Sequence, residues 1–149
     1  MPQCSVVLLP GDLEPQRAEW TSRLIRAGFH VIDVDLPLAD AAPLSVRACA
    51  AVHAASPPGP LVIVAPPSSS GILASIGLAQ RRAHRAVAGY LLIDPLDDPT
   101  GQDWPDAPVI ALDSGSRADL EHHARLRGWE RVPTRGPDDL LAAVGGVAP

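Results

Sequence analysis

Short apolar runs alternate along the chain with stretches in which apolar residues recur at helical spacing. The runs predict six buried strands, at residues 5–9, 29–36, 61–64, 88–93, 109–112 and 129–132. The other stretches predict helices at residues 15–27, 42–55, 72–84, 117–127 and 138–144. This alternation predicts an α/β fold, a doubly wound three-layer sandwich whose six-stranded parallel sheet has strand order 2-1-3-4-5-6.

The centre of this pattern is the stretch LVIVAPPSSSGILASI, residues 61–76. An apolar β-branched run is followed by Pro66 and Pro67, three serines and Gly71, and then by helical spacing. The prolines end the strand, because proline cannot donate to a sheet ladder. Catalytic serines use this succession of strand, tight turn and helix, since the first helical N–H groups face the side chain that the turn raises.

The amino-acid composition excludes some classes of function. The chain of 149 residues is long enough for one domain, residues 1–149, and 46% of it is hydrophobic. All twelve basic residues are arginine, which excludes a Schiff-base lysine and a Ser-Lys dyad. The net charge of -5, without a basic stripe, argues against a nucleic-acid partner.

Membrane and metal partners are not expected either. No apolar run reaches the roughly 20 residues of a membrane span, and the N-terminus lacks a signal-peptide pattern. We therefore expect a cytoplasmic protein. Cys4 and Cys49 make no disulfide framework and no metal cluster, so neither a metal nor a cofactor is expected.

Ligands of doubly wound sheets bind at the carboxyl ends of the strands. We therefore expect the pocket at that edge, walled by the residues 10–13, 66–70 and 96–104. Trp104 is the only aromatic residue of the long loop at residues 96–107. It either closes over the ligand or anchors the loop to the core.

With its elements in this order, the chain resembles the small, lidless members of the α/β-hydrolase family, with a degenerate catalytic triad. VVLLPG is similar to that family's first long strand and oxyanion loop, and LVIVAPPSSSGILAS to its strand, elbow and helix. GYLLIDP resembles the next strand, PVIALDSGSRAD the strand and loop of the catalytic acid, and GWERVP the final strand. The resemblance implies an acyl hydrolase or acyltransferase acting on an ester or thioester. Its substrate would be a small acyl group, for which a carrier protein is one means of delivery.

The elbow pattern of the family is G-x-S-x-G. Ser69 matches it best, with Gly71 two residues later but Pro67 two residues earlier. Ser68 matches less well, and an alignment without a gap places Pro67 itself at the nucleophile position. Ser69 is therefore the candidate nucleophile; the alternative is that these serines only cap the helix.

The acid and base of a triad are harder to assign. Asp119 matches the family's acid, and Asp94 and Asp113, each directly after a strand, are alternatives. The family places its histidine after the last strand, but residues 134–136 contain none. The pair His122–His123, one helical turn after Asp119, is the remaining candidate for the base.

The expected substrate contacts complete the site. They are the oxyanion loop at Gly11, Asp12 and Leu13, the elbow residues Pro67, Ser68 and Ser70, and Asp94 and Trp104. The competing hypothesis is a catalytically inactive binding or scaffold protein of the same fold. The missing family histidine and the double proline favour it.

Overall fold

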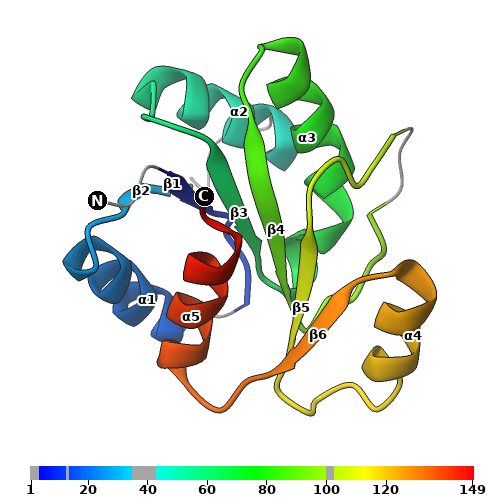
Figure 1. Cartoon of the computed structure of the whole chain (residues 1–149). Coiled ribbons are helices and arrows are strands. Elements are labelled where there is room, and N and C mark those ends of the chain that lie inside the picture. Colours follow the sequence, from blue (N-terminus) through cyan, green and yellow to red (C-terminus); the bar gives the residue numbers. More distant parts are fainter. Residues whose placement is uncertain (1–3, 13, 35–42, 100–102) are drawn as a thin grey trace.

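The computed structural model describes residues 4–12, 14–34, 43–99 and 103–149. Strands and helices alternate through these ranges (Figure 1). The strands are β1 (Ser5–Leu8), β2 (His30–Asp33), β3 (Leu61–Ala65), β4 (Val87–Ile93), β5 (Val109–Asp113) and β6 (Glu130–Pro133). The helices are α1 (Glu14–Arg26), α2 (Leu44–Ala55), the 3₁₀ helix η1 (Pro67–Ile72), α3 (Leu73–Arg82), α4 (Leu120–Arg127) and α5 (Pro137–Val147).

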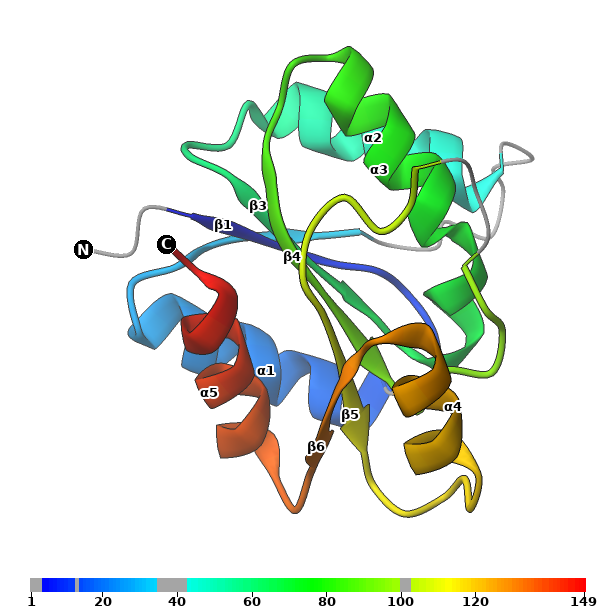
Figure 2. The same cartoon turned by 45° about the vertical axis from the view of Figure 1, so that its right-hand side comes forward.

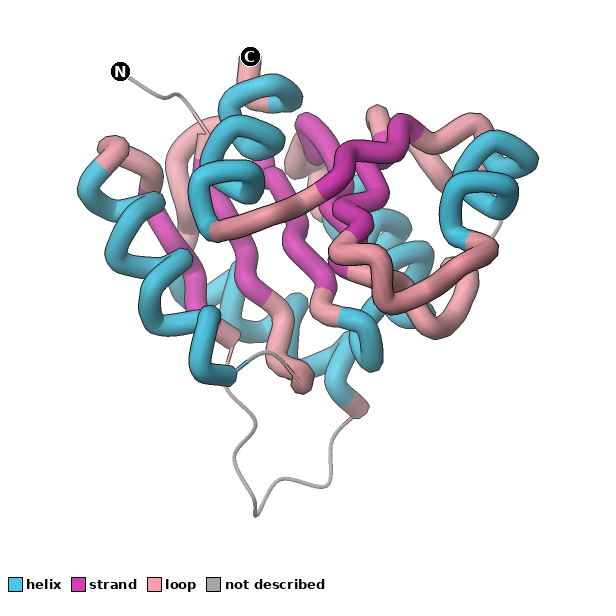
Figure 3. Tube along the Cα trace, turned by 90° about the horizontal axis from the view of Figure 1, so that it is seen from below, coloured by secondary structure: helices cyan, strands magenta, loops and turns pink. Residues whose placement is uncertain are grey.

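The six strands form one sheet in the order β2-β1-β3-β4-β5-β6, and every pair is parallel. The predicted fold class and strand order are confirmed. Helices α2 and α3 lie on one side of the sheet and α1 and α5 on the other (Figure 2). The view from below Figure 1 shows the strands between these layers (Figure 3).

Side chains of the central strands alternate between two hydrophobic clusters, because successive residues of a strand point to opposite faces. Val7 and Ile63 pack under α2, α3 and α4 with Val52, Ile76 and Leu120. Val6 and Val62 pack under α1 and α5 with Leu24, Leu140 and Val144. Strand β3 is buried along its whole length, as its continuous apolar run predicts.

Several element boundaries differ from the predictions. The helix after β3 begins as η1 at Pro67, which suits a first helical turn. Helix α4 begins at Leu120 instead of residue 117. In the preceding turn the Gly115 N–H donates to Asp113, and Arg117 donates to Asp119. Helix α5 continues through the two glycines expected to end it, to Val147, which packs closely against Gly89.

The second strand was predicted over residues 29–36, and the structure gives His30–Asp33. Residues 35 and 36 lie outside the described ranges, as do residue 42 of the second predicted helix and residues 100–102 of the long loop. Across the described ranges, no helix combines the length and apolar character needed to cross a bilayer.

Candidate functional site

The turn after β3 holds Ser69 inside the protein. Its side chain is 1% exposed, and its hydroxyl donates to the carbonyl of Pro10 at the end of β1. The Ser69 N–H donates to the carbonyl of Pro66. No residue between 65 and 72 has a positive φ, so the turn lacks the strained backbone that presents the nucleophile in an elbow.

The flanking serines also bond to the protein. Ser68 is exposed, and its hydroxyl donates to the carboxylate of Asp12. The Ser70 hydroxyl lies 3.0 Å from the carbonyl oxygen of Pro67 and 2.8 Å from that of Asp97, and it accepts from the Asp97 N–H. The serines thus join the turn to the loops after β1 and β4.

Little space remains between this turn and the expected oxyanion loop. A Cβ atom on Gly11 would lie 2.7 Å from Cβ of Pro66 and 2.9 Å from Oγ of Ser68, so the two segments touch. The cavity beside them measures about 10 Å³, roughly the room that one water needs. Gly11 and Asp12 therefore pack against the turn, while Leu13 lies outside the described residues.

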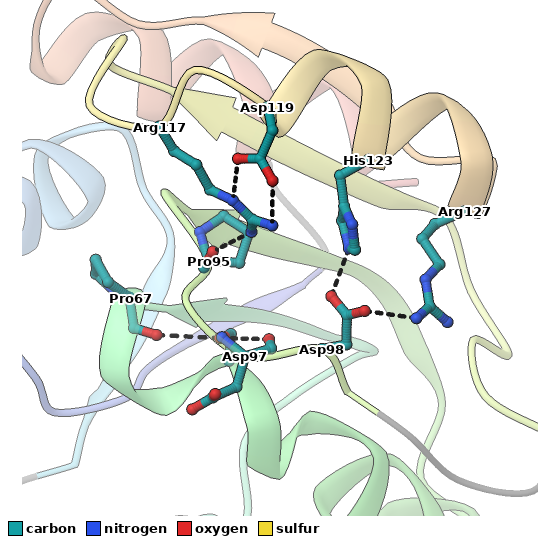
Figure 4. Close-up of polar contacts among 9 residues, drawn as sticks. Pro67, Pro95, Asp97, Asp98, Arg117, Asp119, His123 and Arg127 are labelled. Atoms are coloured by element: carbon teal, nitrogen blue, oxygen red, sulfur yellow. Dashed lines mark hydrogen bonds and ion pairs between the residues drawn. The ribbon is translucent and has the colours of Figure 1, made fainter.

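The predicted acid and base each bond to a different partner (Figure 4). Arg117 Nε lies 2.7 Å from Oδ1 of Asp119, and this hydrogen bond lowers the pKa of the Asp119 carboxyl. Nε2 of His123 lies 2.5 Å from Oδ1 of Asp98, and its ring meets Trp129 edge-on at 5.5 Å. His122 is exposed.

Asp98 was expected only as part of the pocket wall at residues 96–104, and its contacts were not predicted. It lies between His123 and Arg127, and its Oδ2 is 2.5 Å from an Arg127 nitrogen (Figure 4). Its place after the fourth strand was the only signal in the sequence. These contacts attach the loop after β4 to α4. The hydrogen bonds of Ser69, Asp119 and His123 do not join the three residues in a triad.

The two alternative acids stabilise the carboxyl ends of β4 and β5. Asp94, with φ of 42°, accepts from the N–H of Ser114 at 2.9 Å and from its hydroxyl at 2.5 Å. Asp113 is buried and accepts from the Gly115 N–H and from Arg131. Both carboxylates are engaged in holding neighbouring segments.

Trp104 anchors the long loop to the core, which is the second of its two predicted roles. Its ring lies between Tyr90, at 5.2 Å, and Trp129, at 6.3 Å between ring centres. The Tyr90 hydroxyl donates to Asp106 at 2.7 Å. Burial, together with that hydrogen bond, raises the pKa of the Tyr90 hydroxyl.

A pocket of about 310 Å³ opens at the carboxyl edge, between the beginnings of α1 and α5. The residues that line it are Gln16, Glu19, Trp20, Ile93, Asp94, Leu112, Ser114, Thr134, Arg135, Gly136, Pro137 and Leu140. The edge is the expected one, but the walls are not, since only Asp94 comes from the predicted substrate contacts. Another hollow, of about 440 Å³, runs beside α5 over β5 and β6.

The cysteines are unsuited to nucleophilic chemistry, because burial raises the pKa of both thiols. Within the described ranges, no group of three or more His, Cys, Asp or Glu residues could hold a metal ion.

Comparisons with known proteins add no relative: no family model matches this chain, and neither a curated protein nor a solved structure does.

Proposed function

We propose that this chain is a binding protein with an α/β-hydrolase-like scaffold, and that it acts without a serine nucleophile. Its ligand would be a small organic molecule held in the pocket at the carboxyl ends of β4, β5 and β6. Of the two hypotheses that the sequence leaves open, this is the one that the geometry favours. The observation that carries it is the closed turn after β3, where Ser69 is buried on the Pro10 carbonyl.

Acyl transfer needs a nucleophile that can reach its substrate and a base within hydrogen-bond reach of that nucleophile. Ser69 is 1% exposed and its hydroxyl is bonded to the Pro10 carbonyl, so an acyl group cannot reach that hydroxyl in this conformation. His123 is bonded to Asp98 and its ring packs against Trp129, and none of the hydrogen bonds among the described residues joins it to Ser69. For Ser69 to act, its hydroxyl would have to leave Pro10 and the turn would have to open.

The carboxyl-edge pocket has the features of a ligand site. Such edges are where doubly wound sheets bind ligands, and 310 Å³ lies at the lower end of the usual volumes for small molecules. Trp20, Leu112 and Leu140 supply an apolar wall, and Thr134 and Arg135 supply polar groups. An apolar wall with a few polar groups is the usual composition of a binding pocket.

The catalytic hypothesis is tested with a fluorophosphonate probe and intact-mass spectrometry. We expect no adduct on the folded protein. A stoichiometric adduct on Ser68, Ser69 or Ser70 would contradict the proposal and restore serine chemistry.

Binding is tested by ligand-observed NMR with a fragment library. Thr134→Trp places a large side chain in the pocket, and Glu121→Trp, on the exposed side of α4, is the matched control. We expect fragments that bind the wild type to be lost with Thr134→Trp and retained with Glu121→Trp. Fragments that bind all three proteins equally would show that the pocket is not the site.

A further inference from the structure

We propose that the carboxyl-edge pocket selects a monocarboxylic acid with a short apolar chain, whose carboxylate pairs with Arg135. This inference rests on the proposed function and adds the ligand class to it. Three observations carry it: three polar side chains of the pocket have no hydrogen-bond partner in the part of the chain that the structure describes, both of its carboxylates already have one, and the pocket is small and partly apolar.

Three polar side chains that line the pocket have no partner within the described part of the protein. Among the described residues, no hydrogen bond or ion pair involves the side chains of Arg135, Thr134 or Gln16. Arg135 is the only basic residue in the lining. A guanidinium binds a carboxylate through two parallel hydrogen bonds, which an amide or an alcohol cannot reproduce.

The acids that line the pocket already have partners. Glu19 accepts from Arg23 at 2.9 Å and 3.1 Å. Asp94 accepts from both the N–H and the hydroxyl of Ser114. Because Arg135 lacks a partner among the described residues while Glu19 and Asp94 already accept hydrogen bonds, the pocket favours a ligand that carries hydrogen-bond acceptors.

The beginning of α5 does not supply a second anion site. The Asp139 carboxylate accepts from the N–H groups of Arg135 and Gly136, and so occupies the place of an external anion. The positive charge offered to a ligand is therefore that of the Arg135 guanidinium. With two carboxylates also in the wall, a single negative charge fits better than the double charge of a phosphate.

The apolar part of the pocket sets the length of the ligand. Trp20, Ile93, Leu112, Pro137 and Leu140 line it. A volume of about 310 Å³ lies at the lower end of small-molecule pockets, which favours a short ligand. Octanoate, a monocarboxylate with a short apolar chain, is therefore a suitable probe.

Isothermal titration calorimetry of octanoate, octanamide and octylamine tests the inference, with inorganic phosphate as competitor. The variants are Arg135→Gln and, as matched control, Arg82→Gln at the exposed end of α3. We expect octanoate to bind the wild type about tenfold more tightly than the other two, since one charge-assisted hydrogen bond is of that order. Arg135→Gln should remove this preference, Arg82→Gln should keep it, and phosphate should not compete.

Several outcomes would overturn the ligand class. They are a wild type that does not bind octanoate, a preference for octylamine, a preference for octanoate that survives Arg135→Gln, and phosphate binding that depends on Arg135. If fragments are still lost with Thr134→Trp in these cases, the proposed function stands and only the ligand class is wrong. A fluorophosphonate adduct on the turn after β3 would instead overturn the proposed function.

Discussion

Replacing Arg17 should destabilise the fold by an amount that can be worked out from its contacts. Its side chain is 8% exposed although it carries a charge, and it reaches from α1 to the carboxyl ends of β1 and β2. Its nitrogens donate to the carbonyls of Leu9 at 2.5 Å, Leu8 at 2.8 Å and Val34 at 3.0 Å. It also pairs with Asp33. Arg17→Met keeps most of the apolar stem and removes all of these bonds.

The expected loss follows from what each partner does afterwards. The Leu8 carbonyl keeps the N–H of Val34 at 3.0 Å, and the Asp33 side chain, 43% exposed, returns to water at a cost of about 0–1 kcal/mol. The carbonyls of Leu9 and Val34 lose their bond to Arg17, and a buried unsatisfied acceptor costs about 1–3 kcal/mol. Since water can reach strand ends, we expect a total of about 2–4 kcal/mol.

Urea unfolding followed by tryptophan fluorescence measures this loss, with equal slopes required for the comparison. Arg26→Met is the matched control, because Arg26 is exposed on the same helix, and it should change stability by less than about 0.5 kcal/mol. The reasoning would be refuted by an Arg17→Met protein as stable as the control. It would also be refuted if Asp33→Asn alone reproduced the loss, because the ion pair would then outweigh the carbonyl bonds.

Three further predictions concern the core and pH. Gly77→Ala should lower the free energy of unfolding by about 1–3 kcal/mol, because the added Cβ would lie 2.3 Å from the Tyr90 hydroxyl oxygen. Gly145 lies in α5 with open space around it, so Gly145→Ala should instead raise that free energy by up to about 1 kcal/mol in the same assay. Burial raises the pKa of the Tyr90 hydroxyl in the folded state above its ordinary value of about 10. The contribution of Tyr90 to folding stability is therefore fully present below about pH 10 and is lost as the pH rises further. Wild type should there lose up to about 1.4 kcal/mol per pH unit relative to Tyr90→Phe, and parallel pH profiles would contradict this. Ile63→Ala should cost about 2–5 kcal/mol in urea unfolding, since Ile63 is fully buried; a loss below about 1 kcal/mol would contradict its place in the core.

The arrangement of strands could be predicted because it depends on local patterns of apolar and polar residues that are visible in the sequence. A strand buried on both faces needs an unbroken apolar run, as in residues 61–64, and parallel strands joined by helices restrict the order of the sheet. Boundaries were less predictable. Gly145 and Gly146 have helix-ending character, but packing of Val147 on Gly89 extends α5 past them.

The contacts of the candidate site could not be predicted in the same way, because they join residues far apart in the sequence. Ser69 bonds to a carbonyl 59 positions away, and His123 to an aspartate 25 positions away. Helical spacing suggests the pair Asp119–His123, but Arg117 binds Asp119 and Asp98 binds His123. Spacing rules describe neighbours on one helix and do not weigh partners from a loop that folds against it.

Pro67 explains why the turn after β3 is closed. It is the first residue of η1, shortly after the end of β3. Its ring fixes φ near -65°, so it cannot adopt a strained left-handed conformation that would raise a side chain above the sheet. The turn instead continues directly into a helix, which carries Ser69 inward to the Pro10 carbonyl and Ser70 to the loop after β4. The serines of this turn are therefore held by the protein itself, and among the described residues a pocket of about 310 Å³ opens at the carboxyl ends of β4 to β6.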